Sequence, residues 1–209
     1  MPDSGLLLSD LLITFTRVGV WSTVSWLLGL LLGFICYRSK RLEWLILPPV
    51  NFMRHISPFC WLPMIIIMAG IGELAVGITL LISLTFHGVI VTIELLRNLP
   101  KTVLEQARLD GINGWNMLLH IELPLSLSGF IDIYRVLWGV GWSAVIAAEM
   151  LGVRSGMGYR LLDFRYLLRY KEMLVYIAFI GAIGICMDVV LKRIKEFSEK
   201  KIGCYARFS

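Results

Sequence analysis

Hydrophobic residues are concentrated in long blocks along the chain, separated by short polar segments. A membrane-spanning helix needs roughly 20 mostly apolar residues, because the hydrocarbon core of a bilayer is about 30 Å thick. Blocks near this length predict an all-α polytopic membrane protein with about five transmembrane helices in a single domain over residues 1–209. The predicted spans are residues 18–37, 58–70, 74–96, 125–150 and 173–191.

Polar residues and prolines modify the first two blocks. Asp10 and Arg17 precede the first span, so residues 6–15 are predicted to form a separate interfacial helix. Prolines kink helices, so the second block is predicted to contain a shallow amphipathic piece at 44–56 before a span that begins near Pro58. The "GIGE" that follows this span is typical of a tight turn.

Gly29 and Gly33 form a GxxxG pair within the first span. Such a pair lets a second helix approach closely, although glycine is also common in membrane helices without this role. The spacing alone leaves both interpretations open.

Composition supports the membrane assignment. The chain is 57% hydrophobic and 17% charged, whereas soluble domains have about 45–50% apolar and about 25% charged residues. The net charge of +5 is then better explained by membrane topology than by nucleic-acid binding, so no nucleic-acid partner is expected.

Basic residues also predict the orientation. They cluster at 38–41, 97–108 and 192–207, and cytoplasmic loops carry an excess of Lys and Arg. The amino terminus is therefore expected outside and the carboxyl terminus in the cytoplasm. Residues 151–172 then lie outside although they are basic, which suggests that they dock a binding protein or attract an anion. The docking candidates are Arg154, Arg160, Arg165 and Arg169.

Sequence motifs of enzymes are absent or out of context. There is no GxxxxGK[ST], HExxH or GxSxG, and "GVGWSA" at 139–144 lies inside an apolar span, where glycines serve helix packing. The four cysteines and three histidines are far apart in the sequence. We therefore expect no catalytic residue, no metal site and no cofactor.

The ionisable residues Arg135 and Glu149 fall within the predicted span at 125–150. Charges at membrane depth are costly and usually face a cavity or a partner. Fourteen residues separate these two by about 21 Å along a helix, too far for a direct pair. Arg135 is predicted to line a pathway for an anion, and Glu149 lies near the outer mouth, where its side chain could instead snorkel to the interface. Trp142 completes the pathway candidates.

The polar insert at 99–124 has the pattern of a helix–turn–helix elbow. Pro100 suits the first turn of a helix, Lys101, Glu105 and Arg108 have the spacing of surface ion pairs, and Gly111 is suited to end the helix in a left-handed conformation. A second short helix should follow from Trp115, and Pro124 should open the next span. Val103, Ala107, Trp115, Leu118 and Leu119 would form an apolar face that the chain need not bury. Such a face suits a soluble partner or the lipid headgroups.

The elbow resembles the EAA loop of ABC-importer permeases, in which E-A-A-x-x-x-G is followed after nine residues by I-x-L-P. Gln106 replaces the middle alanine. Matching positions are Glu105, Ala107, Gly111, Ile121, Leu123 and Pro124.

Three further segments extend the resemblance to roughly residues 10–195. They are similar to the branch of permeases that imports nitrate, sulfonates, taurine, bicarbonate or thiamine-precursor pyrimidines, whose members usually carry one more amino-terminal span. The segments are "PFCWLPMIIIMAGIGE" (58–73), "AAEML" (147–151) and "SGMGYRLLD" (155–163).

The resemblance implies a type I ABC-importer permease subunit of the inner cell membrane that hydrolyses nothing itself. The resemblance also implies a small, anionic or polar solute and four partners: ABC ATPase subunits, a second permease subunit, an external binding protein and the lipid bilayer. The second permease subunit is most simply an identical copy. A passive channel or scaffold without an ATPase is the alternative, although such a protein has no reason to keep the EAA spacing. The residues expected to couple to the ATPase are Glu105, Ala107, Arg108, Asp110, Gly111, Trp115, Ile121, Leu123 and Pro124.

Overall fold

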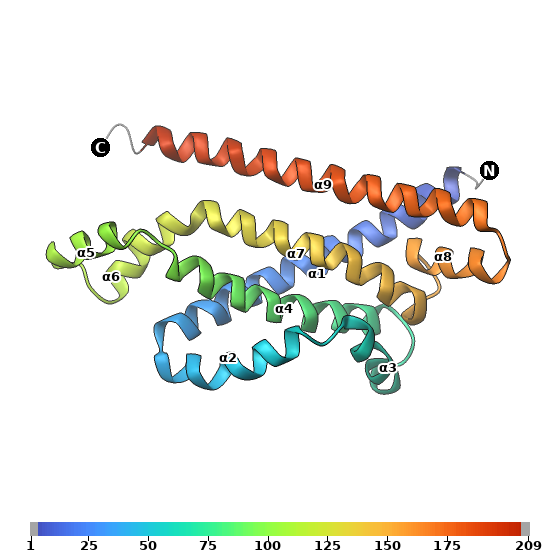
Figure 1. The fold of residues 1–209 in the computed structure, drawn as a ribbon, viewed down its shortest axis with the longest axis horizontal. Helices are drawn as coiled ribbons and strands as arrows, with labels where there is room; N and C mark the ends of the chain where they lie inside the picture. Colours follow the sequence, from blue (N-terminus) through green and yellow to red (C-terminus); the bar gives the residue numbers. More distant parts are fainter. Residues whose placement is uncertain (1–3, 206–209) are drawn as a thin grey trace.

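The computed structural model describes residues 4–205, and within them the side chains of residues 5–197. Helices joined by short turns make up this part of the chain, which has no strand, so the all-α prediction is confirmed (Figure 1). In chain order the helices are α1 (Ser4–Arg38), α2 (Lys40–Arg54), α3 (Pro58–Ala69), α4 (Glu73–Arg97), α5 (Lys101–Leu109), α6 (Trp115–Met117), a π-helical turn (Leu118–Glu122), α7 (Leu123–Gly152), α8 (Met157–Tyr166) and α9 (Tyr170–Tyr205).

Long apolar helices agree with the predicted number of membrane crossings. Within residues 4–205, four helical runs are long and apolar enough to cross a bilayer, and α2 with α3 forms a fifth if this bent pair is one span. The predicted span at 74–96 corresponds to α4 and that at 125–150 to α7. The last span is part of α9, a helix of 36 residues.

The predicted separate interfacial helix at 6–15 is instead the first part of α1, which continues without a break to Arg38. The prediction treats Asp10 and Arg17 as interfacial charges, and the structure shows that they are not. Both side chains are buried, at 3% and 5% exposure, against other helices. Their charges are satisfied inside the protein, so nothing ends the helix between them.

The prediction that residues 58–70 form a complete span is also wrong. At about 1.5 Å per residue, the 12-residue α3 is about 18 Å long, which is too short for a hydrocarbon core of about 30 Å. The preceding α2 already begins at Lys40 and meets α3 at a bend of 96°. The two helices are long and apolar enough for a span only together, and we call this bent pair the broken span.

Close contact between α1 and α4 explains the GxxxG pair. A Cβ atom added to Gly29 would lie 2.8 Å from the Cα of Gly88, and one added to Gly33 would lie 2.6 Å from the Cβ of Thr92. No larger side chain fits between these backbones. The two glycines therefore serve helix packing, as the first of the two interpretations proposed.

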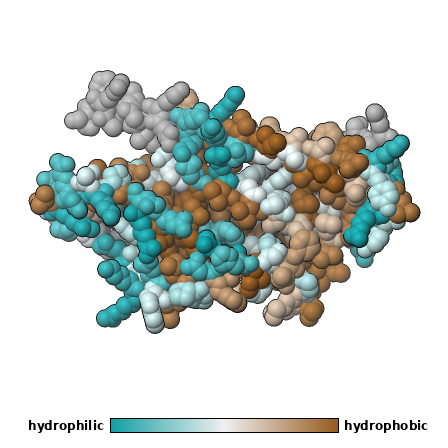
Figure 2. All heavy atoms as spheres, viewed as in Figure 1, coloured by the Kyte–Doolittle hydropathy of each residue, from teal (hydrophilic) through white to brown (hydrophobic). Residues whose placement is uncertain are grey.

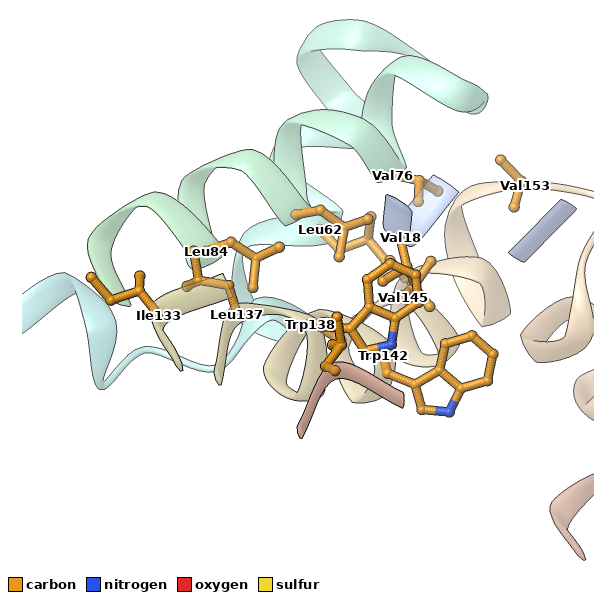
Figure 3. Close-up of a cluster of buried hydrophobic side chains, with 14 residues drawn as sticks. Val18, Leu62, Val76, Leu84, Ile133, Leu137, Trp138, Trp142, Val145 and Val153 are labelled. Atoms are coloured by element: carbon orange, nitrogen blue, oxygen red, sulfur yellow. The ribbon is translucent and has the colours of Figure 1, made fainter. Parts of the chain in front are cut away.

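The main hydrophobic core lies where α1, α3, α4 and α7 meet. Figure 3 shows Val18, Leu62, Leu84 and Leu137 from these four helices pointing toward one another, with Trp138 beside them. All five side chains are at least 96% buried. This core holds the broken span against the continuous helices.

The elbow and α8 lie at opposite ends of the molecule, with the end of α9 at the elbow end and the start of α1 near α8 (Figure 1). Hydrophilic residues gather at both of these ends, with hydrophobic residues between them (Figure 2). The α9 helix lies along one side, and only 11% of its most apolar stretch is buried, against 56% for α4. A single chain therefore leaves much of α9 for lipid or for another subunit.

Candidate functional site

The first arm of the elbow is α5, which begins after Pro100 and ends just before Gly111. Gly111 has a φ of +80°, a left-handed conformation that is strained for other residues. Its N–H donates to the carbonyl of Arg108 at 3.1 Å, and the N–H of Ile112 donates to that of Ala107 at 2.9 Å. The helix and its glycine stop agree with the sequence prediction.

The second arm begins at Trp115 and Pro124 lies in the first turn of α7, as predicted. The structure differs in that no loop separates these helices: the chain is helical from Trp115 through the π-helical turn to Gly152. Proline has no N–H to donate to the regular hydrogen bonds of an α-helix. The π-helical turn just before Pro124 has wider hydrogen bonds, so the pattern of backbone hydrogen bonds already changes at this point. The elbow is therefore a direct extension of α7.

Ala107 does not contribute to an exposed face, contrary to prediction. It is 5% exposed and packs with the buried side chains of Leu96, Leu99, Leu104 and Met117. Phe34 and Tyr37 of α1 and the half-buried Ile112 and Ile121 border this cluster. We call these nine residues the elbow cluster, and they fasten α5 to the ends of α1 and α4 and to the α6 and π-helical segment that leads into α7.

The outward surface of the elbow combines apolar and charged residues. Leu109 is 89% exposed and Trp115 is 70% exposed. The coupling candidates Glu105, Arg108 and Asp110 are exposed beside them, as is Pro124, whereas Leu123 is half-buried. Sequence reasoning missed Leu109 as a candidate contact residue, although its position two residues before the Gly111 turn could have indicated it.

Arg135 is held by a partner that sequence reasoning missed. Its Nε and Nη2 donate to Oδ1 and Oδ2 of Asp188 on α9 at 2.5 and 2.9 Å. The pair lines a cavity of about 580 Å³ between α7 and α9 that Trp142 also lines, and the Trp142 Nε1–H donates to the carbonyl of Ile180 at 3.1 Å. Two of the three pathway candidates therefore share one cavity. Asp188 is the only Asp in the predicted span at 173–191, and this was the signal in the sequence that could have indicated a partner for Arg135.

Glu149 neither lines this cavity nor snorkels to the interface. It is completely buried and accepts hydrogen bonds from Arg17 Nη1 at 2.7 Å, from Thr14 Oγ1 at 2.9 Å and from the N–H of Gly158 at 2.9 Å. Arg17 also contacts Glu73 through its Nε at 2.7 Å. Glu149 thus joins α7 to α1 and α8, which is a structural role.

Glycines of the "SGMG" segment make room for this buried carboxylate. A Cβ atom on Gly156, whose φ is +98°, would lie 2.4 Å from Glu149 Oε1. One on Gly158 would lie 2.2 Å from the carbonyl oxygen of Ile146. The spacing of the segment is explained by the need to wrap its backbone around Glu149.

The four docking candidates divide into two groups. Arg160 donates from Nε to Asp10 Oδ2 at 3.0 Å, which raises the pKa of this guanidinium, and Arg169 pairs with Glu172 at 2.8 Å. These two have structural partners. Arg154 and Arg165 are exposed and have no ion pair within the described side chains, so they remain the docking candidates.

A second cavity was also missed. It has a volume of about 390 Å³ at the bend between α2 and α3, and Arg54, His55 and His87 are among its lining residues. The three histidines are far apart in the sequence, yet His55 and His87 line this one cavity. No group of metal-binding side chains is present within the described part of the chain.

Comparison with known protein families identifies the chain. Residues 25–203 match the family described as the binding-protein-dependent transport system inner membrane component. The chain belongs to this family. The permease is 29% identical over 198 residues to an ABC transporter permease protein of Methanocaldococcus jannaschii, covering 92% of this chain and 73% of that one. It is 25% identical to a bicarbonate transport system permease protein of Synechococcus elongatus, covering 84% and 63% of the two chains.

Solved structures show the same fold. The permease superposes with a TM-score of 0.82 on a chain of the MetNI methionine ABC transporter in an inward-facing conformation, with 18% identity over 93% of this chain and 97% of that chain. The protein is therefore a multi-pass membrane permease subunit of a binding-protein-dependent ABC importer, consistent with a non-enzymatic transport role.

Proposed function

We propose that this permease moves a small anionic or polar solute across the inner cell membrane, driven by an ABC ATPase that docks on the elbow at 99–124. The observation that carries the proposal is the surface of Leu109 and Trp115 at the tip of a rigidly fastened elbow. Large, well-exposed apolar side chains ringed by charges are typical of a protein interface. The elbow and the end of α9 at the same end of the molecule would face the cytoplasm, which puts the carboxyl terminus inside and the amino terminus outside.

The elbow cluster supplies the mechanical connection. Leu96 lies at the end of α4, Phe34 and Tyr37 lie near the end of α1, and Met117 leads into α7. Close-packed interiors transmit displacement because they have few voids. A movement of α5 would therefore move three transmembrane helices together.

ATP acts on such a permease by changing the relative stability of inward- and outward-facing states. A partner shifts this equilibrium only through its different affinity for the two states. Moving the ratio from 1:99 to 99:1 requires about 5.5 kcal/mol. A rigid contact at the elbow can deliver that difference, whereas a flexible loop would dissipate it.

Relatives support the class of solute. One is named as a bicarbonate permease of Synechococcus elongatus and another as an aliphatic sulfonates permease of Bacillus subtilis. Both solutes are anions. An external binding protein would deliver the solute and dock near Arg154 and Arg165, and a second copy of the permease would complete the pathway.

Co-purification tests the elbow contact. The tagged permease is expressed with the ABC ATPase subunits of its source organism, and the ATPase retained after membrane extraction is quantified. Leu109→Asp with Trp115→Asp should reduce this retention about tenfold or more, since central apolar contacts of an interface contribute about 2 kcal/mol or more each.

A matched variant controls for the added charge. Tyr166→Asp with Leu167→Asp changes an aromatic and an aliphatic residue that are 76% and 58% exposed at the opposite end of the molecule. It should retain the ATPase as the unmodified protein does. Equal retention by the elbow variant would contradict the proposal and favour the alternative of a channel or scaffold without an ATPase.

A further inference from the structure

The cavity at the bend between α2 and α3 lies about halfway along the bundle. His87, near the middle of α4, and Ser143 of α7 line one part of it, and Arg54, His55 and Ser57 line the part formed by the bend. Three transmembrane elements therefore contribute polar side chains to one cavity at membrane depth. Polar groups in that position usually mark a pathway for a solute or an ion.

Arg54 differs from Arg17 and Arg135 in its partners. Arg17 is paired with Glu73 and Glu149, and Arg135 with Asp188. Arg54 has no ion pair among the described side chains, and its Nε is buried without a hydrogen-bond partner there. The residues that line the cavity include no carboxylate. A buried charged group without a partner is unfavourable, and an anion bound in the cavity would give the buried Nε of the half-buried Arg54 a partner.

The remaining groups of the cavity are suited to an anion. His87 Nδ1 donates to the carbonyl oxygen of Ser83 at 2.8 Å, and in the imidazolium form its Nε2–H is a second donor. The side chains of Ser57 and Ser143 provide hydroxyl groups. The backbone at the bend leaves the helical pattern between Arg54 and Pro58, and such irregular backbone at membrane depth is tolerated where it lines a cavity.

We propose that this cavity binds the anionic group of the transported solute midway through the membrane, with Arg54 as its counter-ion. The inference rests on the proposed transport function and gives it a location. A guanidinium can form two parallel hydrogen bonds with a carboxylate or sulfonate, and the Nε of Arg54 is one of the donors available. Arg135 does not serve this purpose, because Asp188 already occupies the same donors.

Direct binding tests the site with the purified permease–ATPase complex. The probes are methanesulfonate and bicarbonate, and dimethyl sulfone serves as the uncharged analogue of methanesulfonate. Binding is measured as the rise in the thermal unfolding midpoint of the permease with probe concentration, since a ligand of the folded state stabilises it. Saturable stabilisation by at least one of the two anions and none by dimethyl sulfone is expected.

Variants locate the binding. Arg54→Gln should weaken binding of the effective anion about tenfold or more, because a charged hydrogen bond contributes about 1.5–3 kcal/mol. Arg54→Lys should keep part of the affinity, and His87→Gln should weaken it less than Arg54→Gln does. Arg41→Gln, at an exposed arginine of the same helix, should bind as the unmodified complex does. The His87 variant still tests the site if Arg54→Gln fails to fold.

Two results would overturn the inference. One is stabilisation that is absent or equal for charged and uncharged probes. The other is undiminished anion binding by both the Arg54→Gln and His87→Gln variants. The amount of ATPase that co-purifies with the Arg54→Gln variant is also measured. If this variant retains the ATPase, a loss of anion binding cannot be attributed to a disrupted elbow contact. If anions bind at Arg54 but the elbow variant still holds the ATPase, the site stands and the proposed coupling surface falls.

Discussion

Arg17 and Glu149 form an ion pair inside the protein, with Nη1 and Oε1 2.7 Å apart and both side chains at least 95% buried. The pair joins α1 to α7, although 132 residues separate the two positions in the sequence. Thr14 and the N–H of Gly158 bond the same carboxylate. The end of the molecule that carries α8 is therefore organised around one buried charge.

Removing that charge should destabilise the permease. Glu149→Gln leaves Arg17 partly uncompensated, and breaking a buried ion pair costs about 3–5 kcal/mol. Chemical unfolding of the purified protein, followed by circular dichroism, measures the loss. Glu94→Gln, at an exposed glutamate of α4, is the control and should change little; equal stability of the two variants would refute the structural role of Glu149.

Gly158→Ala should also destabilise the protein, by about 1–3 kcal/mol, which is typical of overpacking. Its new methyl group would meet the carbonyl oxygen of Ile146, a backbone atom that cannot turn away. Gly139→Ala provides the comparison, since a Cβ there meets nothing within 4 Å and alanine favours a helix. The same unfolding assay should rank Gly139→Ala at or above the unmodified protein; a Gly158→Ala variant of equal stability would contradict the packing argument.

Sequence patterns within single segments predict the helices of this fold well, but they do not predict which charged side chains are buried or what their partners are. The spans at 74–96 and 125–150 and the helix stop at Gly111 follow from apolar runs and turn chemistry within the segment itself. The continuity of α1 depends on partners such as Glu149 and Arg160, far along the sequence from Thr14, Arg17 and Asp10. No local pattern reveals such partners, and the cavity at Arg54 was missed for the same reason.

Exchanging the charges of Arg135 and Asp188 tests whether their pair matters as a pair. Arg135→Asp alone places two acidic groups together, and Asp188→Arg alone places two basic ones, so each single variant should reduce the yield of folded protein. The double variant restores opposite charges and should recover most of it. Size-exclusion chromatography of detergent-extracted protein gives the readout; a double variant no better than the single ones would show that the pairing is not needed.

The exposed external arginines should affect delivery of the solute, not stability. Arg154→Gln with Arg165→Gln is expected to weaken uptake severalfold and to lower its salt dependence, since long-range attraction between charged surfaces is screened by salt. Arg160→Gln should instead destabilise the fold, because it removes the partner of the buried Asp10. Uptake at two salt concentrations, together with unfolding curves, distinguishes these effects. Unchanged uptake by the double variant would exclude Arg154 and Arg165 as a docking surface.

Gly111 provides the sharpest test of energy coupling through the elbow. Gly111→Val places a β-branched residue at a φ of +80°, where L residues are strained, and so disturbs the turn that joins the two arms. Gly70→Val is a matched control: Gly70 has a φ of +79°, also meets nothing within 4 Å, and lies in the turn after α3, away from the elbow. Both variants place valine at a positive φ, where it is strained.

The central claim is tested by ATP hydrolysis of the complex reconstituted in liposomes, measured with and without the solute-loaded binding protein. Coupling through the elbow predicts that the binding protein stimulates hydrolysis in the unmodified complex and in Gly70→Val, and that Gly111→Val, although inserted in the membrane, loses about tenfold or more of this stimulation. Full stimulation in Gly111→Val would contradict it.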